Sequence, residues 1–442
     1  SSDGERRSSE NSSGAEDTFR MADNDFDLSR LLGADSSMPP PAAPGHGTNH
    51  NSRHALAGGA NSGSETDQAA IYKPKLDDFE MVRVLGKGSF GKVMLCRKRD
   101  TGKFYAMKVL KKQHVIRRKQ VAHTKTERSV LGQVDHPFVV KLHYAFQTGD
   151  KLHFVLDFCS GGELFFHLGR AGRFSEHLGR FYTAEIALAL GHLHSKGVVY
   201  RDLKPENILL DAEGHIKLAD FGLSKEGISE SVKGTHSFCG TPEYLAPEVL
   251  NRNGHGSAVD WWSLGALLYE MLTGLPPWYS QDRQKMFASI RSSELRFPEY
   301  ISAMARLILT DFLERDVRRR LGSARDIEEV REHPFFSPMD WHRLSRREIP
   351  APFVPKLNSQ TDTGNFDTQF TRMPINSMDM NNFSVSPTPA HAMAASIGSE
   401  QPMFDGFTFI EQSTLVQQMN RVSLSKRTPS SPTLSSSLMY ES

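Results

Sequence analysis

One short segment of the sequence holds the residue types that phosphoryl transfer requires. Residues 200–207 read Tyr-Arg-Asp-Leu-Lys-Pro-Glu-Asn. Asp202 can accept the proton of a hydroxyl group, and Lys204 can neutralise charge on the phosphoryl group that moves. Asn207 offers a side-chain oxygen, the kind of ligand that Mg²⁺ prefers. The spacing therefore predicts a catalytic loop in which an aspartate acts on a hydroxyl group.

Three residues elsewhere in the chain would complete such a site. Asp220, in the sequence Asp-Phe-Gly, adds a second carboxylate for a metal ion. Lys108 lies on a predicted strand, and Glu127 lies on a predicted helix at 121–131. A lysine that grips the α- and β-phosphates needs a carboxylate to hold its ammonium group in place. Each residue alone could be an ordinary surface charge, but together and in this order they predict a nucleotide site.

A glycine-rich segment at 86–93 reads Gly-Lys-Gly-Ser-Phe-Gly-Lys-Val. A dinucleotide-binding fold would need a helix after the third glycine, and a Walker-type P-loop would need Ser or Thr where Val93 stands. The residues that follow, up to the turn at 100–102, are typical of strand and hairpin. The segment therefore favours a glycine-rich hairpin over nucleotide phosphates, and a merely flexible turn is the alternative.

The elements that must position these residues fall between Phe79 and Phe336. Short β-rich runs broken by glycine-containing turns are predicted first, at 79–85, 92–98 and 104–111. Helices follow: one starts at Ser175 and stops before Gly197, and a second, at 257–273, is apolar nearly all round. The sequence predicts an α+β fold with two lobes, a β-rich small lobe at about 79–157 and a helical large lobe at about 158–336.

Segments of different composition flank this unit. Residues 1–71 contain no lysine, valine or tryptophan, so they are expected to form a disordered N-terminal arm. Residues 337–412 are polar but keep spaced prolines and phenylalanines, which favours a tail that wraps onto the folded body. Residues 413–442 are rich in serine and are expected to be disordered.

Composition restricts the class of protein. The chain has 442 residues and a formal net charge of +1, which does not suggest a nucleic-acid partner. Three scattered cysteines, Cys96, Cys159 and Cys239, favour a reducing compartment over a disulfide framework. No apolar run approaches the roughly 18 residues that a membrane span needs. We expect a cytoplasmic protein, with a further population in the nucleus left open.

Because these motifs occur together and in this order, residues 79–336 resemble a eukaryotic protein kinase. Ala-Pro-Glu at 246–248 closes the activation segment as that family expects. The resemblance implies a bilobal protein kinase fold, ATP and Mg²⁺ at the site, and an ion pair between Glu248 and Arg320. The lysine two residues after the catalytic aspartate and Gly-Thr-Pro-Glu at 240–243 are similar to the serine/threonine branch of the family.

The resemblance also implies roles for individual residues. The catalytic residues would be Lys108, Glu127, Asp202, Lys204 and Asn207. The metal ligands would be Asn207 and Asp220. The nucleotide would contact Leu85, Gly86, Lys87, Gly88, Ser89, Phe90, Gly91, Val93, Ala106, Lys108, Leu156, Asp157, Cys159 and Glu163.

Two features of the catalytic unit place the resemblance in the AGC group. Tyr200 stands where most protein kinases have a histidine. Ser-Phe-Cys-Gly-Thr at 237–241 resembles the AGC activation loop, with Ser237 as the phosphorylated residue. The resemblance implies that three basic side chains hold this phosphate, those of His123, Arg201 and Lys225.

The C-terminal segment carries a third AGC feature. Phe-Asp-Gly-Phe-Thr-Phe at 404–409 resembles the hydrophobic motif, with Thr408 as its phosphorylation site. Ser377 stands at the turn-motif site, although the usual proline does not follow it. Phe366 resembles the tail residue that reaches the adenine pocket. Residues 365–371 together with the hydrophobic motif are most similar to ribosomal protein S-six kinase, with protein kinase B and serum/glucocorticoid-regulated kinase as near relatives.

The resemblance extends to substrates and partners. Three carboxylates match positions at which basophilic AGC kinases hold arginines, so we predict Arg at −3 and −5 before the acceptor Ser or Thr; they are Glu163, Glu206 and Glu270. Upstream partners would be a phosphoinositide-dependent kinase and a target-of-rapamycin complex, the latter through Phe-Asp-Leu at 26–28. We expect a monomer. The alternative is a pseudokinase scaffold that binds nucleotide without catalysis, which the complete catalytic set disfavours.

Overall fold

The computed structural model describes residues 73–88, 91–226, 241–375 and 401–411. Several predicted features therefore lie outside the described residues: the N-terminal arm at 1–71, the tail at 413–442, Ser89, Phe90, Ser237, Cys239 and Ser377. All described residues belong to one compact unit, Tyr72–Ser442. Among them, no helix combines the length and apolar character that crossing a membrane would require.

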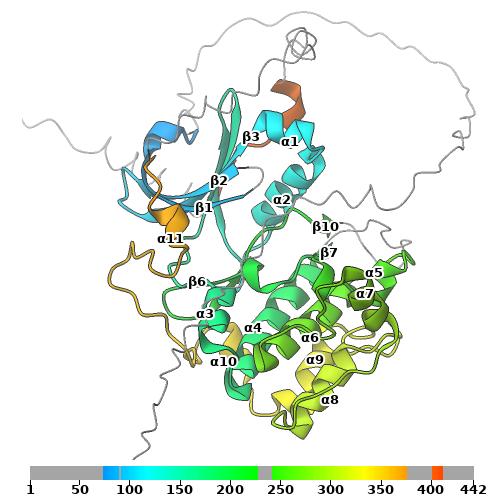
Figure 1. The fold of residues 1–442 in the computed structure, drawn as a ribbon. Helices are drawn as coiled ribbons and strands as arrows, with labels where there is room; N and C mark the ends of the chain where they lie inside the picture. The colour runs from blue at the N-terminus through cyan, green and yellow to red at the C-terminus, as the bar shows by residue number, and fades with distance from the viewer. Residues whose placement is uncertain (1–72, 89–90, 227–240, 376–400, 412–442) are drawn as a thin grey trace, which may run out of the picture. The chain divides into compact units, whose positions relative to one another are not determined.

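The small lobe is built on an antiparallel sheet with the strand order β1-β2-β3-β5-β4-β11. Its strands are β1 (Phe79–Lys87), β2 (Gly91–Lys98), β3 (Phe104–Lys111), β4 (Leu142–Gln147), β5 (Lys151–Leu156) and β11 (Phe409–Ile410). The first three match the predicted strands within two residues. Between β3 and β4 lie two helices, α1 (Lys112–Arg117) and α2 (Val121–Gln133), as Figure 1 shows.

The large lobe is mainly helical. Its helices are α3 (Leu164–Ala171), α4 (Glu176–Ser195), α5 (Pro247–Leu250), α6 (Ala258–Thr273), α7 (Arg283–Ser292), α8 (Ala303–Phe312), α9 (Ile327–Glu332) and α10 (Trp341–Ser345). Two small sheets accompany them: β6 (Gly162–Glu163) with β8 (Ile208–Leu210) and β9 (Ile216–Leu218), and β7 (Val198–Val199) with β10 (Lys225–Glu226). The predicted α+β fold with a β-rich small lobe and a helical large lobe is confirmed.

Local sequence explains the ends of the two central helices. The Ser175 hydroxyl accepts the Leu178 N–H at 3.3 Å and caps the start of α4, as predicted. At the end of α6, Gly274 adopts φ +89, and a Cβ there would also lie 2.4 Å from the Gly172 carbonyl oxygen. Only glycine fits both constraints, so α6 must stop at this point.

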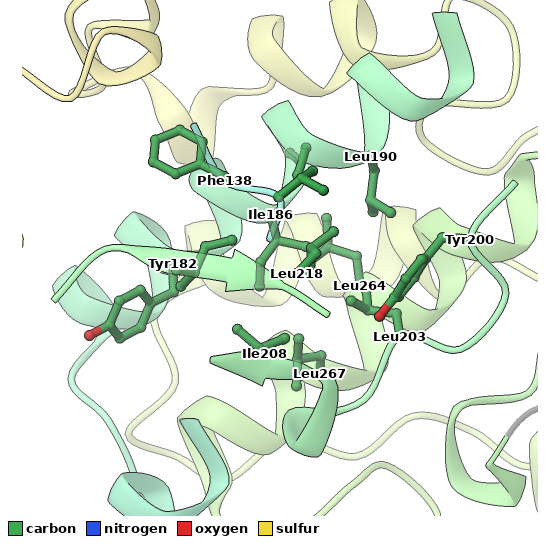
Figure 2. Packing of buried hydrophobic residues seen from close by; sticks show 14 of the residues in the cluster. Phe138, Tyr182, Ile186, Leu190, Tyr200, Leu203, Ile208, Leu218, Leu264 and Leu267 are labelled. Carbon is green, nitrogen blue, oxygen red and sulfur yellow. The ribbon is translucent and has the colours of Figure 1, made fainter. Parts of the chain in front are cut away.

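The core of the large lobe packs against the predicted catalytic loop and the strands on either side of it. Apolar residues of α4 and α6 pack against the strands that flank that loop (Figure 2). The residues labelled there are Phe138, Tyr182, Ile186, Leu190, Tyr200, Leu203, Ile208, Leu218, Leu264 and Leu267, and all of them are buried. Because protein cores pack as densely as organic crystals, this cluster holds the loop on a rigid base.

The described part of the C-terminal segment contacts both lobes. Arg347 pairs with Asp211 of the large lobe at 2.6 Å, and Thr363 accepts a hydrogen bond from Arg83 of β1 at 3.1 Å. A short helix, α11 (Thr368–Thr371), packs against β1, and β11 then joins the sheet beside β4. The expected wrapping tail is therefore present in the residues that the structure describes.

Candidate active site

Lys108 joins the two elements that carry its predicted partners. Its Nζ lies 2.7 Å from Oε1 of Glu127 on α2 and 3.4 Å from Oδ1 of Asp220, which follows β9. Burial acts to lower the pKa of Lys108, but the carboxylates of Asp220 and Glu127 raise it above its ordinary value. Glu127 and Asp220 therefore hold the ammonium group in place as a fixed positive charge, as a phosphate-binding lysine requires.

The predicted catalytic loop forms a second cluster. Lys204 Nζ lies 3.1 Å from Oδ2 of Asp202, and the Asn207 amide donates to the same oxygen at 2.8 Å. Asn207 also donates to the Asp202 carbonyl at 2.8 Å. Oδ1 of Asp202 is buried and has no hydrogen-bond partner among the described residues. The arrangement fixes one carboxylate oxygen and leaves the other to accept a hydroxyl proton.

The pKa values of Asp202 and Asp220 are shifted in opposite directions. Burial and the charge of Asp220 raise the pKa of Asp202, although Lys204 opposes the shift. Lys108 lowers the pKa of Asp220 against the effect of burial. A carboxyl group with a raised pKa is the better proton acceptor, and one with a lowered pKa stays ionised for a cation. The electrostatics thus agree with Asp202 as base and Asp220 as metal ligand.

Asp260 of α6 anchors the catalytic loop by its backbone. Its carboxylate accepts the N–H groups of Tyr200 at 2.8 Å and Arg201 at 2.7 Å. Arg201 adopts φ +68, a conformation that costs energy for a non-glycine residue and persists only when neighbours enforce it. Tyr200, which replaces the usual histidine, donates its hydroxyl to the Ala219 carbonyl beside Asp220. The predicted catalytic loop and the segment that carries Asp220 are therefore tied together.

His194 supports that anchor, and the sequence analysis did not identify it. Its Nε2 lies 2.9 Å from Asp260 and its Nδ1 lies 2.8 Å from Asp326, so both ring nitrogens act as donors. Burial opposes protonation, but the two carboxylates raise the pKa of His194 to about 9. Asp326 comes from a distant loop before α9, so no local pattern in the sequence could have linked it to this histidine.

The glycine-rich segment is a β-hairpin, as predicted. Gly86 pairs with Val93 across β1 and β2, and the Gly88 N–H donates to the Gly91 carbonyl at 3.0 Å. A Cβ at Gly91 would lie 1.8 Å from the Val109 carbonyl oxygen, so only glycine fits there. A Cβ at Gly86 or Gly88 would meet no atom of the described residues within 4 Å. Such a hairpin can bring backbone N–H groups close to phosphates.

Several residues predicted to contact the nucleotide lie in the small-lobe sheet or shortly after it. Ala106 of β3 is half-buried and pairs with Leu156 at the end of β5. Leu85 is buried at the end of β1, and Cys159 is buried with its thiol pKa raised by burial. Lys87 is exposed on the hairpin.

Asp157, the first residue of the segment 157–159 that joins the two lobes (the hinge), differs from this group because its side chain is bound by His143 at 2.8 Å and Lys217 at 3.2 Å. Its N–H donates to the Lys141 carbonyl at 3.1 Å, so only its carbonyl remains for the adenine base.

The C-terminal segment also reaches the hinge. Phe366 stacks on Phe158 of the hinge, with ring centroids 6.0 Å apart. The Asn365 amide donates to the Ser160 carbonyl at 3.2 Å, and its own carbonyl oxygen would lie 2.4 Å from a Cβ at Gly162. Gly162 is therefore needed for the close approach of the segment. The structure places Phe366 beside the hinge, in agreement with its predicted position near the adenine pocket.

The three predicted arginine-binding carboxylates lie in different surroundings. Glu163 is accessible to solvent on β6, but neighbouring atoms partly desolvate its carboxylate, and this desolvation together with the charges of Glu206 and Asp367 raises its pKa to about 7. Glu270 is buried on α6, where it accepts the Tyr244 hydroxyl, and burial raises its pKa to about 7. Glu206 acts electrostatically on both. The charge of Glu206 thus affects both other carboxyl groups, although Glu163 is exposed and Glu270 is buried.

The end of the activation segment is held by the predicted ion pair. Arg320 donates to both carboxylate oxygens of Glu248, at 2.6 and 2.9 Å, and their side chains are 0% and 8% exposed. Of the residues predicted to bind the Ser237 phosphate, His123 lies close enough to Arg201 for that charge to lower its pKa, after burial. Lys225 is exposed on β10. Ser237 itself lies outside the described residues.

The predicted hydrophobic motif occupies the groove between the sheet and α2. Phe404 and Phe407 are buried, and Phe407 meets Phe154 of β5 edge to face at 5.1 Å. Arg128, which follows Glu127 on α2, donates to the Phe407 carbonyl at 3.2 Å and the Thr408 carbonyl at 3.1 Å. The Thr408 side chain is exposed. The motif therefore contacts the helix that positions Glu127, and Arg128 is a contact that the motif alone did not reveal.

Comparison with known proteins decides the family. The protein kinase domain family matches residues 79–336, and the protein kinase C terminal domain matches residues 357–409. The chain belongs to the protein kinase family. The predicted enzyme class, a serine/threonine protein kinase with an AGC-type tail, is confirmed.

Three relatives illustrate the similarity. The chain is 54% identical to "Protein kinase 2" of Dictyostelium discoideum over 340 residues, 77% of this chain and 68% of that protein. It is 47% identical to the "RAC family serine/threonine-protein kinase homolog" of the same organism over 366 residues, 82% of this chain and 78% of the relative. It is also 47% identical to "Ribosomal protein S6 kinase beta" of Caenorhabditis elegans over 363 residues, 80% of this chain and 63% of the relative.

Proposed function

We propose that this kinase transfers the γ-phosphoryl group of Mg-ATP to Ser or Thr in arginine-rich sequences. The observation that carries the proposal is the position of Lys108, which contacts Glu127 and Asp220 at once. This arrangement requires α2 to be packed against the sheet with Glu127 pointing inward. The pseudokinase alternative has no comparable observation in its favour. Against it, Lys108 contacts Glu127 and Asp220, and both Lys204 and Asn207 contact Asp202.

The described residues fit a nucleotide with its metal. Magnesium-bound ATP would supply the activated phosphoryl group and the cations that neutralise its charge. Asp220 and Asn207 have oxygens suited to hold Mg²⁺, and Lys108 has the charge to hold phosphates. The Asp157 N–H donates to the Lys141 carbonyl at 3.1 Å, so adenine would bind the Asp157 carbonyl and the backbone of Cys159.

Catalysis by the chain itself rests on Asp202 and Lys204. The free Oδ1 of Asp202 would accept the hydroxyl proton of the substrate and orient its oxygen, while Oδ2 stays bound to Lys204 and Asn207. Lys204 would then approach the phosphoryl group as negative charge builds on it. The raised pKa of Asp202 makes its carboxylate a better acceptor for that proton.

Substrate preference follows from the charge of the groove. Glu163, Glu206 and Glu270 would pair with arginines at −3 and −5 before the acceptor residue. Oε2 of Glu206 is buried and has no hydrogen-bond partner within the described part of the chain, which supports a role in binding a cationic group.

Regulation would use three phosphorylation sites, Ser237, Ser377 and Thr408. Phosphate on Ser237 would bind the basic side chains beside α2, and phosphate on Thr408 would strengthen docking of the hydrophobic motif. A phosphoinositide-dependent kinase and a target-of-rapamycin complex would act upstream, in growth and nutrient signalling in the cytoplasm and nucleus. The similarity to ribosomal S-six kinases supports this assignment.

The proposal is tested by transfer of radiolabelled phosphate from ATP to a peptide with arginines at −3 and −5. We expect incorporation by the native chain and a loss of more than about 100-fold for Asp202→Asn, because general base catalysis contributes about 10²–10⁴-fold. Replacing the −3 arginine should weaken the reaction. Equal incorporation by the native chain and Asp202→Asn would contradict the proposed role of the aspartate, and a peptide array without any arginine preference would contradict the assigned substrates.

A further inference from the structure

Glu411, the second residue after the hydrophobic motif, connects the docked tail to β4. The strand β11 pairs with β4 in an antiparallel register, Phe409 opposite Ala145 and Ile410 opposite Tyr144. Directly after it, the Glu411 N–H donates to the His143 carbonyl at 3.0 Å. The Glu411 carboxylate lies 3.2 Å from Lys141 Nζ, and its side chain is only 13% exposed. Glu411 therefore holds the tail by a backbone hydrogen bond to His143 of β4 and by an ion pair to Lys141, the residue before β4.

Lys141 and His143 each bind the hinge residue Asp157 as well. Lys141 donates its N–H to Asp157 Oδ2 at 3.2 Å, and its carbonyl accepts the Asp157 N–H at 3.1 Å. His143 Nε2 lies 2.8 Å from Asp157 Oδ1. Two residues thus contact Glu411 on one side and Asp157 on the other. The tail also contacts the hinge region through the stack of Phe366 on Phe158 and the hydrogen bond from the Asn365 amide to the Ser160 carbonyl.

We propose that Glu411 is a positioning residue through which the docked hydrophobic motif sets the geometry of the adenine-binding hinge. The inference rests on the proposed function, since it takes the backbone at Asp157 as part of the ATP site. The tail would then act by two routes. Arg128 and α2 would link the tail to Glu127 and the phosphate site. Glu411 would link the tail to the adenine site at the hinge.

The electrostatics support a specific ion pair rather than a loose surface contact. Burial acts to lower the pKa of Lys141, yet hydrogen bonding and charge from Glu411 raise it above the ordinary value. Lys141 has a second carboxylate neighbour, Asp135, at 3.4 Å, but the Asp135 side chain is 82% exposed and is screened by water. Glu411 and Asp135 both pair with Lys141, but Asp135 is exposed and does not belong to the tail. Asp135 therefore provides a matched control.

The two routes predict different kinetic effects. Glu411→Gln should raise the Kd and KM of ATP about five-fold, the size of one partly buried ion pair, and leave kcat nearly unchanged. Asp135→Asn should change neither constant. Phe407→Ala, which removes the buried anchor of the motif, should raise KM and lower kcat together because it breaks both routes.

The experiment uses the full chain phosphorylated at Ser237 and Thr408. ATP affinity is measured by calorimetry and the kinetic constants with an arginine-containing peptide. In a double-mutant cycle, Glu411→Gln should have no further effect on ATP affinity in a Lys141→Met background, as expected if the two residues act as a pair.

The outcomes separate this inference from the proposed function. Unchanged ATP affinity in Glu411→Gln, or a loss confined to kcat, would overturn the hinge route while leaving the kinase assignment intact. An equal effect of Asp135→Asn would show a general charge effect and would also overturn it. If the native chain itself bound no ATP, the proposed function would fail instead.

Discussion

The buried ion pair between Glu248 and Arg320 allows a quantitative prediction. Arg320 is fully buried, and besides both oxygens of Glu248 it binds the Ala258 carbonyl at 2.9 Å and the Glu314 carbonyl at 2.9 Å. Glu248→Gln would leave the guanidinium group in the core without a compensating charge. Removing one partner of a buried pair costs about 3–5 kcal/mol, which corresponds to a fall in the unfolding midpoint on the order of 10 °C for a domain of this size.

Thermal unfolding followed by calorimetry measures this effect, and an exposed ion pair serves as its control. Arg318 lies 3.1 Å from Asp316, but the Arg318 side chain is 89% exposed. Arg318→Gln should therefore leave the unfolding midpoint unchanged, because water already solvates both charges. The reasoning is refuted if Glu248→Gln loses less than about 1 kcal/mol, the range of exposed pairs, or if both variants unfold at the same temperature.

Three further predictions concern pH and regulation. The pKa of His194 is raised to about 9, so its stabilisation is complete below about pH 6.5, its unfolded value, and is lost as the pH rises through 9. His194→Gln should therefore lower the free energy of unfolding by roughly 3 kcal/mol at pH 6, and the difference from the native chain should shrink toward pH 9 in denaturant titrations. Glu163, with a pKa of about 7, must be ionised to hold an arginine, so the KM of an arginine peptide should rise as the pH falls below 7. Glu163→Gln should reduce that dependence, and an unaltered profile would exclude the residue from substrate binding. Thr408→Ala, in protein phosphorylated at Ser237, should lower kcat on the order of ten-fold because the Thr408 phosphate strengthens docking. Calorimetry should still detect ATP binding in that variant, and an unchanged kcat would contradict the docking account.

The local part of the fold could be predicted because short-range patterns determine it. The first three strands and the helices α4 and α6 begin and end where β-rich runs, caps and glycines indicated. The catalytic residues were also predictable, since they come in short motifs whose spacing reflects a common chemistry. Lys108, Glu127 and Asp220 lie together as expected.

Contacts between distant segments could not be predicted in the same way. Nothing near Glu411 indicates that it pairs with Lys141, or that β11 becomes the sixth strand of the small-lobe sheet. Asp157 was predicted only as a contact of the nucleotide, and the binding of its side chain to His143 depends on the pairing of β4 with β5. Such contacts follow from tertiary packing, which no local periodicity encodes.

The central claim is that side chains from both lobes converge on one triphosphate and its metal ions. A crystal structure of the chain with Mg²⁺ and a non-hydrolysable ATP analogue tests it most directly. We predict phosphates bound to Lys108, Mg²⁺ bound to Asp220 and Asn207, and the Asp202 carboxylate facing the site of the acceptor hydroxyl. An empty cleft, or a bound analogue with Lys108 and Asp220 turned away from its phosphates, would contradict the account.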